Sequence, residues 1–172
     1  MKFNPFFLAL LVCGLAFQAC NNDDDNDDTM QPSGGDPITE QNVRAVFNFL
    51  PPSGYESTVY EENLPGGVTA VYKNQTTDMN IQVAAAENLT GEVIQVTNAV
   101  VESSFLNPVD IMESTVNGTT VYQSMEESAY RVVIFRGQYS FNVIVPNDPD
   151  PAEAETEVAK FIELIADAMS TF

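Results

Sequence analysis

Residues 130–145 read YRVVIFRGQYSFNVIV, and this stretch decides the fold that we predict. In its second half, apolar and aromatic side chains occupy every other position and share one face: Tyr139, Phe141, Val143 and Val145. Alternation with a period of two is typical of half-buried strands, and the Arg136-Gly137 pair is typical of a turn. The stretch therefore predicts a β-hairpin with strands at 130–135 and 138–145.

The sequence on either side extends this pattern. Residues 109–116 and 119–125 flank Asn117-Gly118, a pair that suits the type I′ turn of a second hairpin. After the first hairpin, Asp150, Pro151 and Glu153 are typical of the start of a helix. Apolar residues then recur at helical spacing, namely Val158, Phe161, Ile162, Ile165 and Met169. We expect this amphipathic helix to lie across the sheet.

The N-terminal half of the domain predicts a helix over 39–50 and three strands at 57–61, 67–73 and 79–85. Thr39 is the expected N-cap, and Pro51-Pro52 ends the helix. Its apolar stripe comprises Val43, Val46, Phe47 and Leu50. We expect one face of the first two strands to carry Val59, Val68, Ala70 and Tyr72. The chain is thus predicted to form a single α+β domain over 38–172, an antiparallel sheet packed against an N-terminal and a C-terminal helix.

Residues 90–106 are open to two interpretations. A helix capped by Thr90 would place Val93, Val96 and Val100 on one side, but β-branched residues disfavour helices. We favour a helix because the run is longer than a typical strand. The order of residues 122–172, two hairpins and then a closing helix, resembles PsbP-like domains. That resemblance implies an α/β/α sandwich.

The composition excludes several classes of function. The 172 residues contain no His, so Ser-His-Asp and Cys-His catalysis and His-ligated zinc are not available. The net charge of −19 repels a phosphate backbone, so we expect no nucleic-acid partner. We also predict no cofactor and no enzymatic activity.

The first 20 residues are typical of an export signal. Lys2 precedes an apolar run over 5–17, which is too short to span a bilayer as a helix. The run ends in FQAC at residues 17–20, which resembles the lipobox of bacterial lipoproteins, and this resemblance implies cleavage after residue 19 and lipid on Cys20. The alternative is an ordinary secretory signal that leaves Cys20 as a free thiol.

Residues 20–37 predict a disordered acidic tether. Five like charges lie within six positions and cannot fold on themselves: Asp23, Asp24, Asp25, Asp27 and Asp28. A calcium-binding loop is disfavoured, because Asp28 and Gly34 stand where an EF-hand needs Gly and Glu. An acidic run after the lipidated Cys resembles the export signal of surface lipoproteins of Bacteroidetes, which implies an anchor in the outer membrane facing the extracellular side. Asp28-Thr29-Met30 resembles their O-glycosylation acceptor, with Thr29 as the candidate residue.

Residues 38–172 contain 5 basic and 19 acidic side chains, so the domain itself carries −14. Asp148 and Asp150, close to Glu153 and Glu155, could hold calcium, but we favour helix capping and a solvated Asp148. Glu61-Glu62 and Glu126-Glu127 are adjacent pairs whose members would point apart in a strand, so we expect solvated charges.

Two further groups were candidates for binding. Arg131 and Arg136 could hold a carboxylate or phosphate, but we favour salt bridges to nearby carboxylates. The six Tyr residues could stack on a sugar if several were exposed together, and we favour packing in the sheet.

The sequence therefore predicts a non-catalytic cell-surface lipoprotein, held in the membrane through lipid on Cys20, that presents its acidic domain for binding or assembly. One alternative is a carrier of a lipid or another apolar ligand between sheet and helix. Another is a His-free hydrolase with paired carboxylates. The partner and the oligomeric state are not specified by the sequence.

Overall fold

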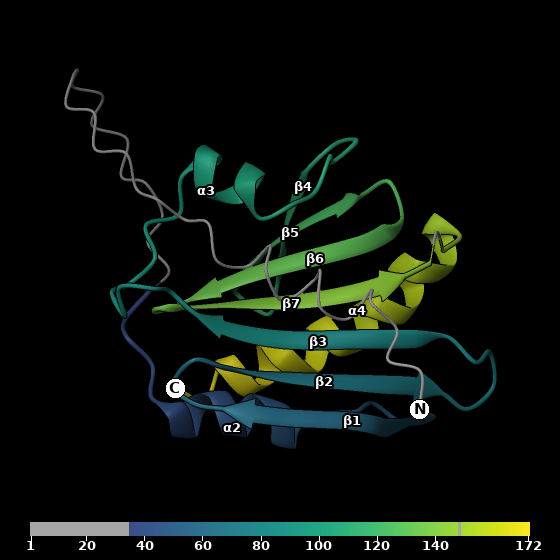
Figure 1. Ribbon diagram of the computed structural model, residues 1–172, viewed down its shortest axis with the longest axis horizontal. Coiled ribbons are helices and arrows are strands. Elements are labelled where there is room, and N and C mark those ends of the chain that lie inside the picture. Colours follow the sequence, from purple (N-terminus) through teal and green to yellow (C-terminus); the bar gives the residue numbers. More distant parts are fainter. Residues whose placement is uncertain (1–34, 148) are drawn as a thin grey trace.

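The computed structural model describes residues 35–147 and 149–172, which form a seven-stranded antiparallel sheet with helices packed on it (Figure 1). The helices are α2 Glu40–Asn48, α3 Asn98–Ser103 and α4 Pro151–Met169. The strands are β1 Tyr55–Asn63, β2 Gly67–Asn74, β3 Asn80–Glu87, β4 Met112–Val116, β5 Thr119–Met125, β6 Ala129–Arg136 and β7 Tyr139–Pro146. The predicted α+β class, with a helix near each end of the domain, is confirmed.

The sheet is assembled from two meanders. Its order is β1-β2-β3-β7-β6-β5-β4, so the first three strands join the last four through the β3–β7 pair. In that pair Ala85 lies opposite Phe141, and both side chains are buried. The hairpin predicted from residues 130–145 therefore occupies the centre of the sheet.

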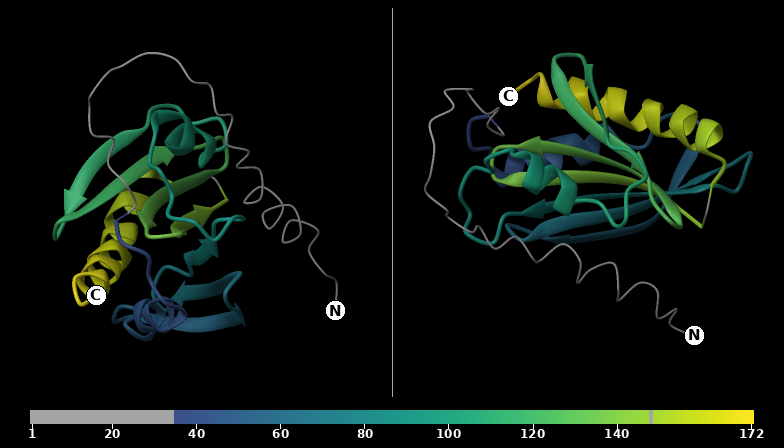
Figure 2. Two further views of the ribbon diagram at one scale, coloured as in Figure 1. Left: turned by 90° about the vertical axis from the view of Figure 1, so that its left-hand side faces the viewer. Right: turned by 90° about the horizontal axis from the view of Figure 1, so that it is seen from above.

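Helices cover both faces of the sheet (Figure 2). On one face α2 and α4 pack over a core that includes the predicted stripes of both helices. On the other face α3 and the preceding loop cover β5 and β6, with Val96, Val101 and Phe105 against Tyr122 and Phe135. The centre of the larger core is Phe161 of α4, whose ring lies 4.9 Å from that of Tyr55 and 5.5 Å from that of Tyr72.

The helix starts follow the sequence prediction. The hydroxyl of Thr39 accepts a hydrogen bond from the Asn42 N–H at 3.2 Å, and Asn42 Oδ1 accepts one from the Thr39 N–H at 2.8 Å. Asp150 Oδ1 accepts hydrogen bonds from Ala152 and Glu153, both at 3.1 Å, ahead of Pro151. These side chains satisfy N–H groups that have no partner within the helix.

The predicted face of Val59 is wrong because of a β-bulge. The register between β1 and β2 shifts between Ser57 and Val59, so that Val59 lies opposite Val71. An uninterrupted ladder would have placed it opposite Ala70, on the side of the helices. A bulge reverses the facing of the residues that follow it. As a result Tyr60, instead of Val59, faces α2, where its ring lies 6.2 Å from that of Phe47.

The predicted helix over 90–106 is wrong in extent, since only Asn98–Ser103 is helical. Thr97 caps it, with its hydroxyl accepting from Val100 N–H at 3.2 Å. Upstream, Gly91 has a φ of +68°, which interrupts a helix, and the Ile94 N–H donates to the carbonyl of Gly137 at 2.9 Å. Residues 94–101 instead pack β-branched side chains, among them Ile94, Val96 and Val101, against β5 and β6. Because β-branched residues also disfavour helices, a long helix does not form here.

The central turn lies one residue later than predicted, at Gly137-Gln138. Gly137 has a φ of +57°, and a Cβ there would lie 2.8 Å from the nitrogen of Ile38. Gln138 hydrogen-bonds to both main-chain groups of Ile38, at 3.0 and 2.8 Å. The turn therefore needs glycine for its conformation and also for the close passage of residues 36–38.

A partly buried polar contact joins α4 to the first two strands. Glu157 accepts hydrogen bonds from Tyr55 at 2.5 Å and from Asn74 at 3.3 Å, and it pairs with Lys160 at 2.6 Å. Burial alone would raise the pKa of Glu157, but the hydrogen bonds from Lys160 and Tyr55 outweigh it, so the pKa lies below 4.5. The ionised form is therefore stabilised by folding.

This lowered pKa predicts a specific acid sensitivity. Stability contributed by ionised Glu157 is present above about pH 4.5 and is lost as the pH falls through the lower pKa of the folded protein. The substitution Glu157→Gln should make the free energy of unfolding fall less steeply between about pH 5 and 3. Urea unfolding at several pH values measures this slope. Glu163→Gln, on the exposed side of the same helix, is the control, and equal slopes for the two variants would contradict the prediction.

Candidate functional site

The residues predicted to direct lipidation, export and glycosylation lie outside the described residues. These are the lipidation residue Cys20, the export residues Asp23, Asp24, Asp25, Asp27 and Asp28, and the glycosylation candidate Thr29. Within the described part, no helix combines the length and the apolar character needed to cross a membrane.

The candidate calcium site is only partly within the described chain. Asp148 lies outside it, and Asp150 caps α4 as described above. Among residues 35–147 and 149–172, no three or more Asp, Glu, Cys or His side chains come together as metal ligands would. Asp150 thus has the capping role that the sequence favours.

The adjacent carboxylate pairs have separate environments. Glu61 lies opposite Thr69 and Glu62 opposite Val68, so the two point to opposite faces as predicted. Glu62 is not simply solvated: Arg44 of α2 contacts it at 2.7 Å, and hydrogen bonds from Arg44 and then Tyr60 lower its pKa. This ion pair links α2 to β1.

The prediction of a solvated charge is wrong for Glu126, which is 6% exposed. Its Oε1 accepts hydrogen bonds from Arg131 Nε at 2.8 Å and from the Leu106 N–H at 2.7 Å. The predicted salt bridge of Arg131 is confirmed, with a partner in the loop between β5 and β6. Buried carboxylates need such partners, and here the pair also fixes the loop that follows α3.

The tyrosines pack as the favoured interpretation predicts. Tyr60 is 51% exposed, whereas the other five are buried. Burial and the nearby Glu155 raise the pKa of Tyr130 to about 12. In the described chain there is accordingly no exposed group of tyrosines on which a sugar could stack.

A concave site lies where β5 and β6 separate. The ladder between them runs from Met125 opposite Tyr130 to Tyr122 opposite Val133 and ends there. Beyond this point β5 stays paired with β4, and β6 stays paired with β7 as far as Arg136. The ends of the two strands that are not paired with each other, residues 119–121 of β5 and 134–136 of β6, diverge as a wedge. A cavity of about 340 Å³ lies in this wedge.

The β4–β5 hairpin leans out of the sheet towards the end of α4 (Figure 2). Its turn residues Asn117 and Gly118 have φ values of +48° and +80°, as a type I′ turn requires. Asn117 Nδ2 donates a hydrogen bond to Asp167 of α4 at 2.7 Å. This contact holds the hairpin against the helix and keeps the wedge open.

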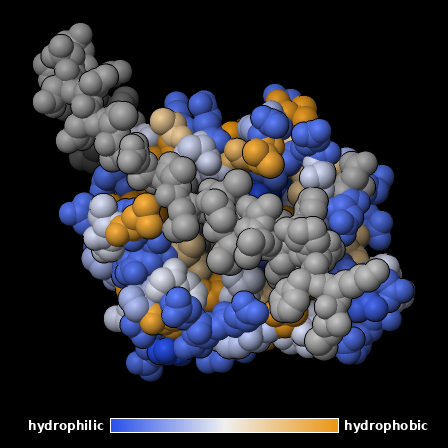
Figure 3. Space-filling model, viewed as in Figure 1, coloured by the Kyte–Doolittle hydropathy of each residue, from blue (hydrophilic) through white to orange (hydrophobic). Residues whose placement is uncertain are grey.

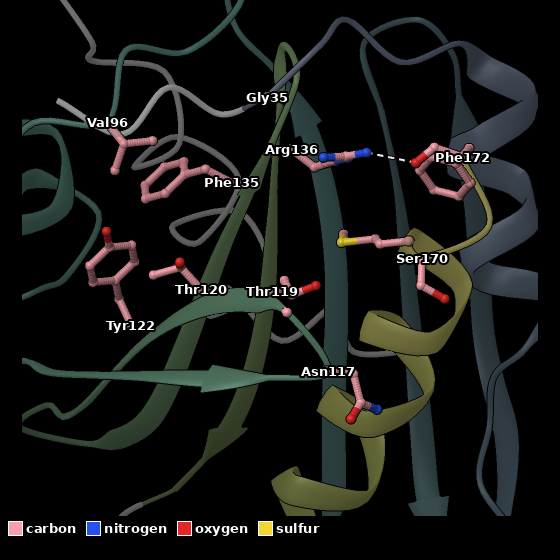
Figure 4. Close-up of a pocket in the computed structure, with 12 residues that line it drawn as sticks. Gly35, Val96, Asn117, Thr119, Thr120, Tyr122, Phe135, Arg136, Ser170 and Phe172 are labelled. Atoms are coloured by element: carbon pink, nitrogen blue, oxygen red, sulfur yellow. Dashed lines mark hydrogen bonds between the residues drawn. The ribbon is translucent and has the colours of Figure 1, made fainter. Parts of the chain in front are cut away.

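The walls of the cavity combine aromatic and hydrogen-bonding groups (Figure 4). Tyr122 and Phe135 lie together on one side, with ring centroids 6.0 Å apart. On the other side Phe172 lies beside Arg136, whose Nη2 donates to the Phe172 main-chain oxygen at 2.6 Å. Thr119, Thr120 and Ser170 add hydroxyl groups. The cavity can thus bind a small molecule that has both an apolar and a polar part.

Arg136 makes no salt bridge with a described Asp or Glu side chain, and its Nη2 instead contacts an oxygen of Phe172, the last residue of the printed sequence. Its Nε is buried and, within the described chain, has no hydrogen-bond acceptor. The sequence singled out Arg136, but it carried no signal for the threonines and aromatic residues around it, because their proximity depends on where two strands part.

The chain matches no protein-family model, no curated protein and no solved structure. The resemblances to surface lipoproteins and to PsbP-like domains therefore stay predictions.

Two alternative functions depend on sites that can be located in the fold. A carrier needs space between sheet and α4, where buried side chains of both form the larger core and a recess of about 130 Å³ lies beside β4. A carboxylate hydrolase needs a carboxyl group with a raised pKa, whereas the pKa values of Glu62, Asp78 and Glu157 are lowered. No observation in the described chain favours either alternative.

The buried ion pair leads to a prediction about stability. Glu126→Gln removes the charge that compensates Arg131, whose side chain is 14% exposed. We expect the free energy of unfolding to fall by about 3 kcal/mol. Glu127→Gln, at the exposed neighbouring position, should change it by less than about 0.5 kcal/mol. Urea unfolding followed by circular dichroism measures both, and similar losses in the two variants would contradict a compensating role for Glu126.

Proposed function

We propose that this chain is a lipid-anchored protein of the outer membrane that acts by binding, with its acidic domain on the extracellular side. The observation that carries the binding role is the cavity between β5 and β6, where a guanidinium, hydroxyl groups and aromatic rings surround one space. These groups can hold a ligand, and among them no nucleophile is paired with a base. Binding without a chemical step is the function that this set of groups supports best.

The proposed location rests on the sequence before the domain. The FQAC motif at 17–20 supports lipid on Cys20, and the acidic run at 23–28 supports export to the surface. Residues 20–37, if fully extended, span at most about 60 Å. A domain on such a tether meets its ligand in water beyond the membrane surface.

The surface of the domain agrees with this role. On the face shown in Figure 3, hydrophobic residues form small separate areas among hydrophilic ones. The net charge of −14 on residues 38–172 adds to the hydrophilic character. Such a surface favours exposure to water over burial in a large apolar interface.

Lipidation is tested by metabolic labelling with a fatty-acid analogue. We expect label on the wild-type chain and none on Cys20→Ala, because the thiol of Cys20 is the proposed lipid acceptor. Cys13→Ala is the matched control and should keep the label, since Cys13 lies in the segment proposed to be removed. Equal labelling of the wild type and Cys20→Ala would rule out the lipid anchor.

Surface export is tested by protease treatment of intact cells. The wild-type domain should be digested, and replacing Asp23, Asp24, Asp25, Asp27 and Asp28 by Asn should protect it, because the neutral chain lacks the proposed export signal. A control variant removes five exposed charges from the domain itself, by Gln at Glu56, Glu92, Glu102, Glu127 and Glu163. It should be digested like the wild type. Unchanged digestion of the Asn variant would contradict the role of the acidic run.

A further inference from the structure

The strand β4 forms one edge of the sheet, and no strand of the described chain pairs with its outer side. The order of the sheet places β1 at one edge and β4 at the other (Figure 1). The side chains of β4 are exposed or half-buried along its whole length. An open edge offers main-chain N–H and C=O groups to any further strand, and proteins usually protect such edges.

The two edges of this sheet differ in their protection. The strand β1 is interrupted by the bulge after Ser57 and carries three glutamates. The strand β4 pairs with β5 in an unbroken register, and its one charged residue is Glu113. Bulges and charges hinder pairing with a further strand, whereas a regular edge permits it. The β4 edge is therefore the one that can accept an added strand.

The turn of the β4–β5 hairpin identifies the main-chain groups that are free at this edge. With a two-residue turn, the flanking residues Val116 and Thr119 form a hydrogen-bonded pair, and such pairs alternate along the ladder. Every second residue back from Val116 therefore bonds to β5. The residues between them, Glu113 and Thr115, direct their N–H and C=O groups outwards.

Exposed apolar side chains gather beside the same edge. Leu106, Val109 and Met112 are 55%, 73% and 49% exposed, and they make up half of the large apolar side chains exposed in the described residues. The Val109 N–H donates to the carbonyl of Met125 at 3.0 Å, so this segment continues the line of β4 along β5. Exposed apolar groups next to a free edge are typical of a surface that contacts another chain.

The recess of about 130 Å³ between β4 and α4 indicates which side chains the added strand carries. Val116, Ala159 and Ile162 give it an apolar lining. Glu155 and Glu163 lie in its wall, on either side of Ala159 along α4, and both are exposed. The ion pairs of the described residues use neither of these glutamates. Two carboxylates are thus available to basic side chains over the recess.

The spacing of the two glutamates matches the repeat of a strand. Glu155 and Glu163 are eight residues apart on α4, which is about 12 Å at a rise of about 1.5 Å per residue. Side chains four residues apart in a strand point to one face and are about 13 Å apart. The net charge of −14 on the domain attracts a basic segment and repels a second copy of this domain.

We propose that the edge of β4 binds an extended, basic segment of another protein, which adds to the sheet as a further antiparallel strand. Its main chain hydrogen-bonds to Glu113 and Thr115, and two of its Lys or Arg side chains, four residues apart, contact Glu155 and Glu163. The main-chain bonds supply affinity, and the spacing of the charges supplies specificity. This surface is separate from the cavity between β5 and β6, so the inference goes beyond the binding role proposed for that cavity.

The test uses the full-length chain, isotope-labelled and purified in detergent, and the peptide acetyl-TKTVTKT-amide. Alternation places both of its Lys side chains on one face with the central Val. We expect saturable shifts of the amide NMR signals of Glu113 and Thr115, with half-saturation below about 1 mM. Acetyl-TETVTET-amide should bind at least about tenfold more weakly, because its charges are reversed. Half-saturation above about 1 mM, or equal binding of the two peptides, would overturn the proposal.

Methylated peptides separate strand addition from attraction between charges alone. In the proposed pairing, the third and fifth residues of acetyl-TKTVTKT-amide direct their N–H groups to β4, and the fourth and sixth direct theirs to water. N-methylation of the third and fifth should weaken binding at least about tenfold, whereas N-methylation of the fourth and sixth should change it less than about threefold. Equal weakening by the two modifications would refute the added strand.

Variants of the chain locate the basic contacts. Glu155→Gln combined with Glu163→Gln should weaken binding of acetyl-TKTVTKT-amide by about threefold to thirtyfold. Glu56→Gln combined with Glu61→Gln removes the same charge from the β1 edge and should bind like the wild type. Equal affinities of the two double variants would place the contacts elsewhere and refute the assignment. Concentration-dependent shifts of the same β4 amides without peptide would make a second copy the occupant, which also overturns the proposal.

Discussion

The packing of Phe161 between Tyr55 and Tyr72 is the contact on which the rest of the domain depends. Phe161 is fully buried at the middle of α4, and the two tyrosines come from the edge strand β1 and its neighbour β2. Removal of a buried aromatic ring costs about 3–5 kcal/mol, a large part of the stability of a typical domain. The Glu157 contacts one turn away fix the same helix to the same strands. The position of the C-terminal end of α4 follows from these contacts.

The position of the C-terminal end of α4 in turn determines where β5 separates from β6. The β4–β5 hairpin has two neighbours, β6 at its open end and α4 at its turn, through Asn117 and Asp167. Because the hairpin reaches towards the helix, it pairs with β6 over only four residues of β5. The separated strands leave a cavity that neither a flat sheet nor an isolated hairpin would contain. The opposite end of the wedge is secured by the buried pair of Glu126 and Arg131.

Local patterns predicted most of the elements but little of the site. The hairpins, the caps at Thr39 and Asp150 and the buried stripes of α2 and α4 depend on residues close in sequence, and the structure confirms them. The bulge after Ser57 has no local signal, so the face of Val59 was wrong. The extent of α3 was wrong because the side chains of residues 93–96 gain more from packing on β5 and β6 than from helix formation. The cavity was missed because it arises from strand divergence, a property of pairing between distant segments.

The acidity of the domain determines the partners of its basic side chains. Four of the described basic side chains contact a carboxylate at 2.6 to 2.8 Å, and the excess of acidic residues leaves most carboxylates without a basic partner. Because the domain carries −14, polyanions are repelled at long range, whichever part of its surface they approach.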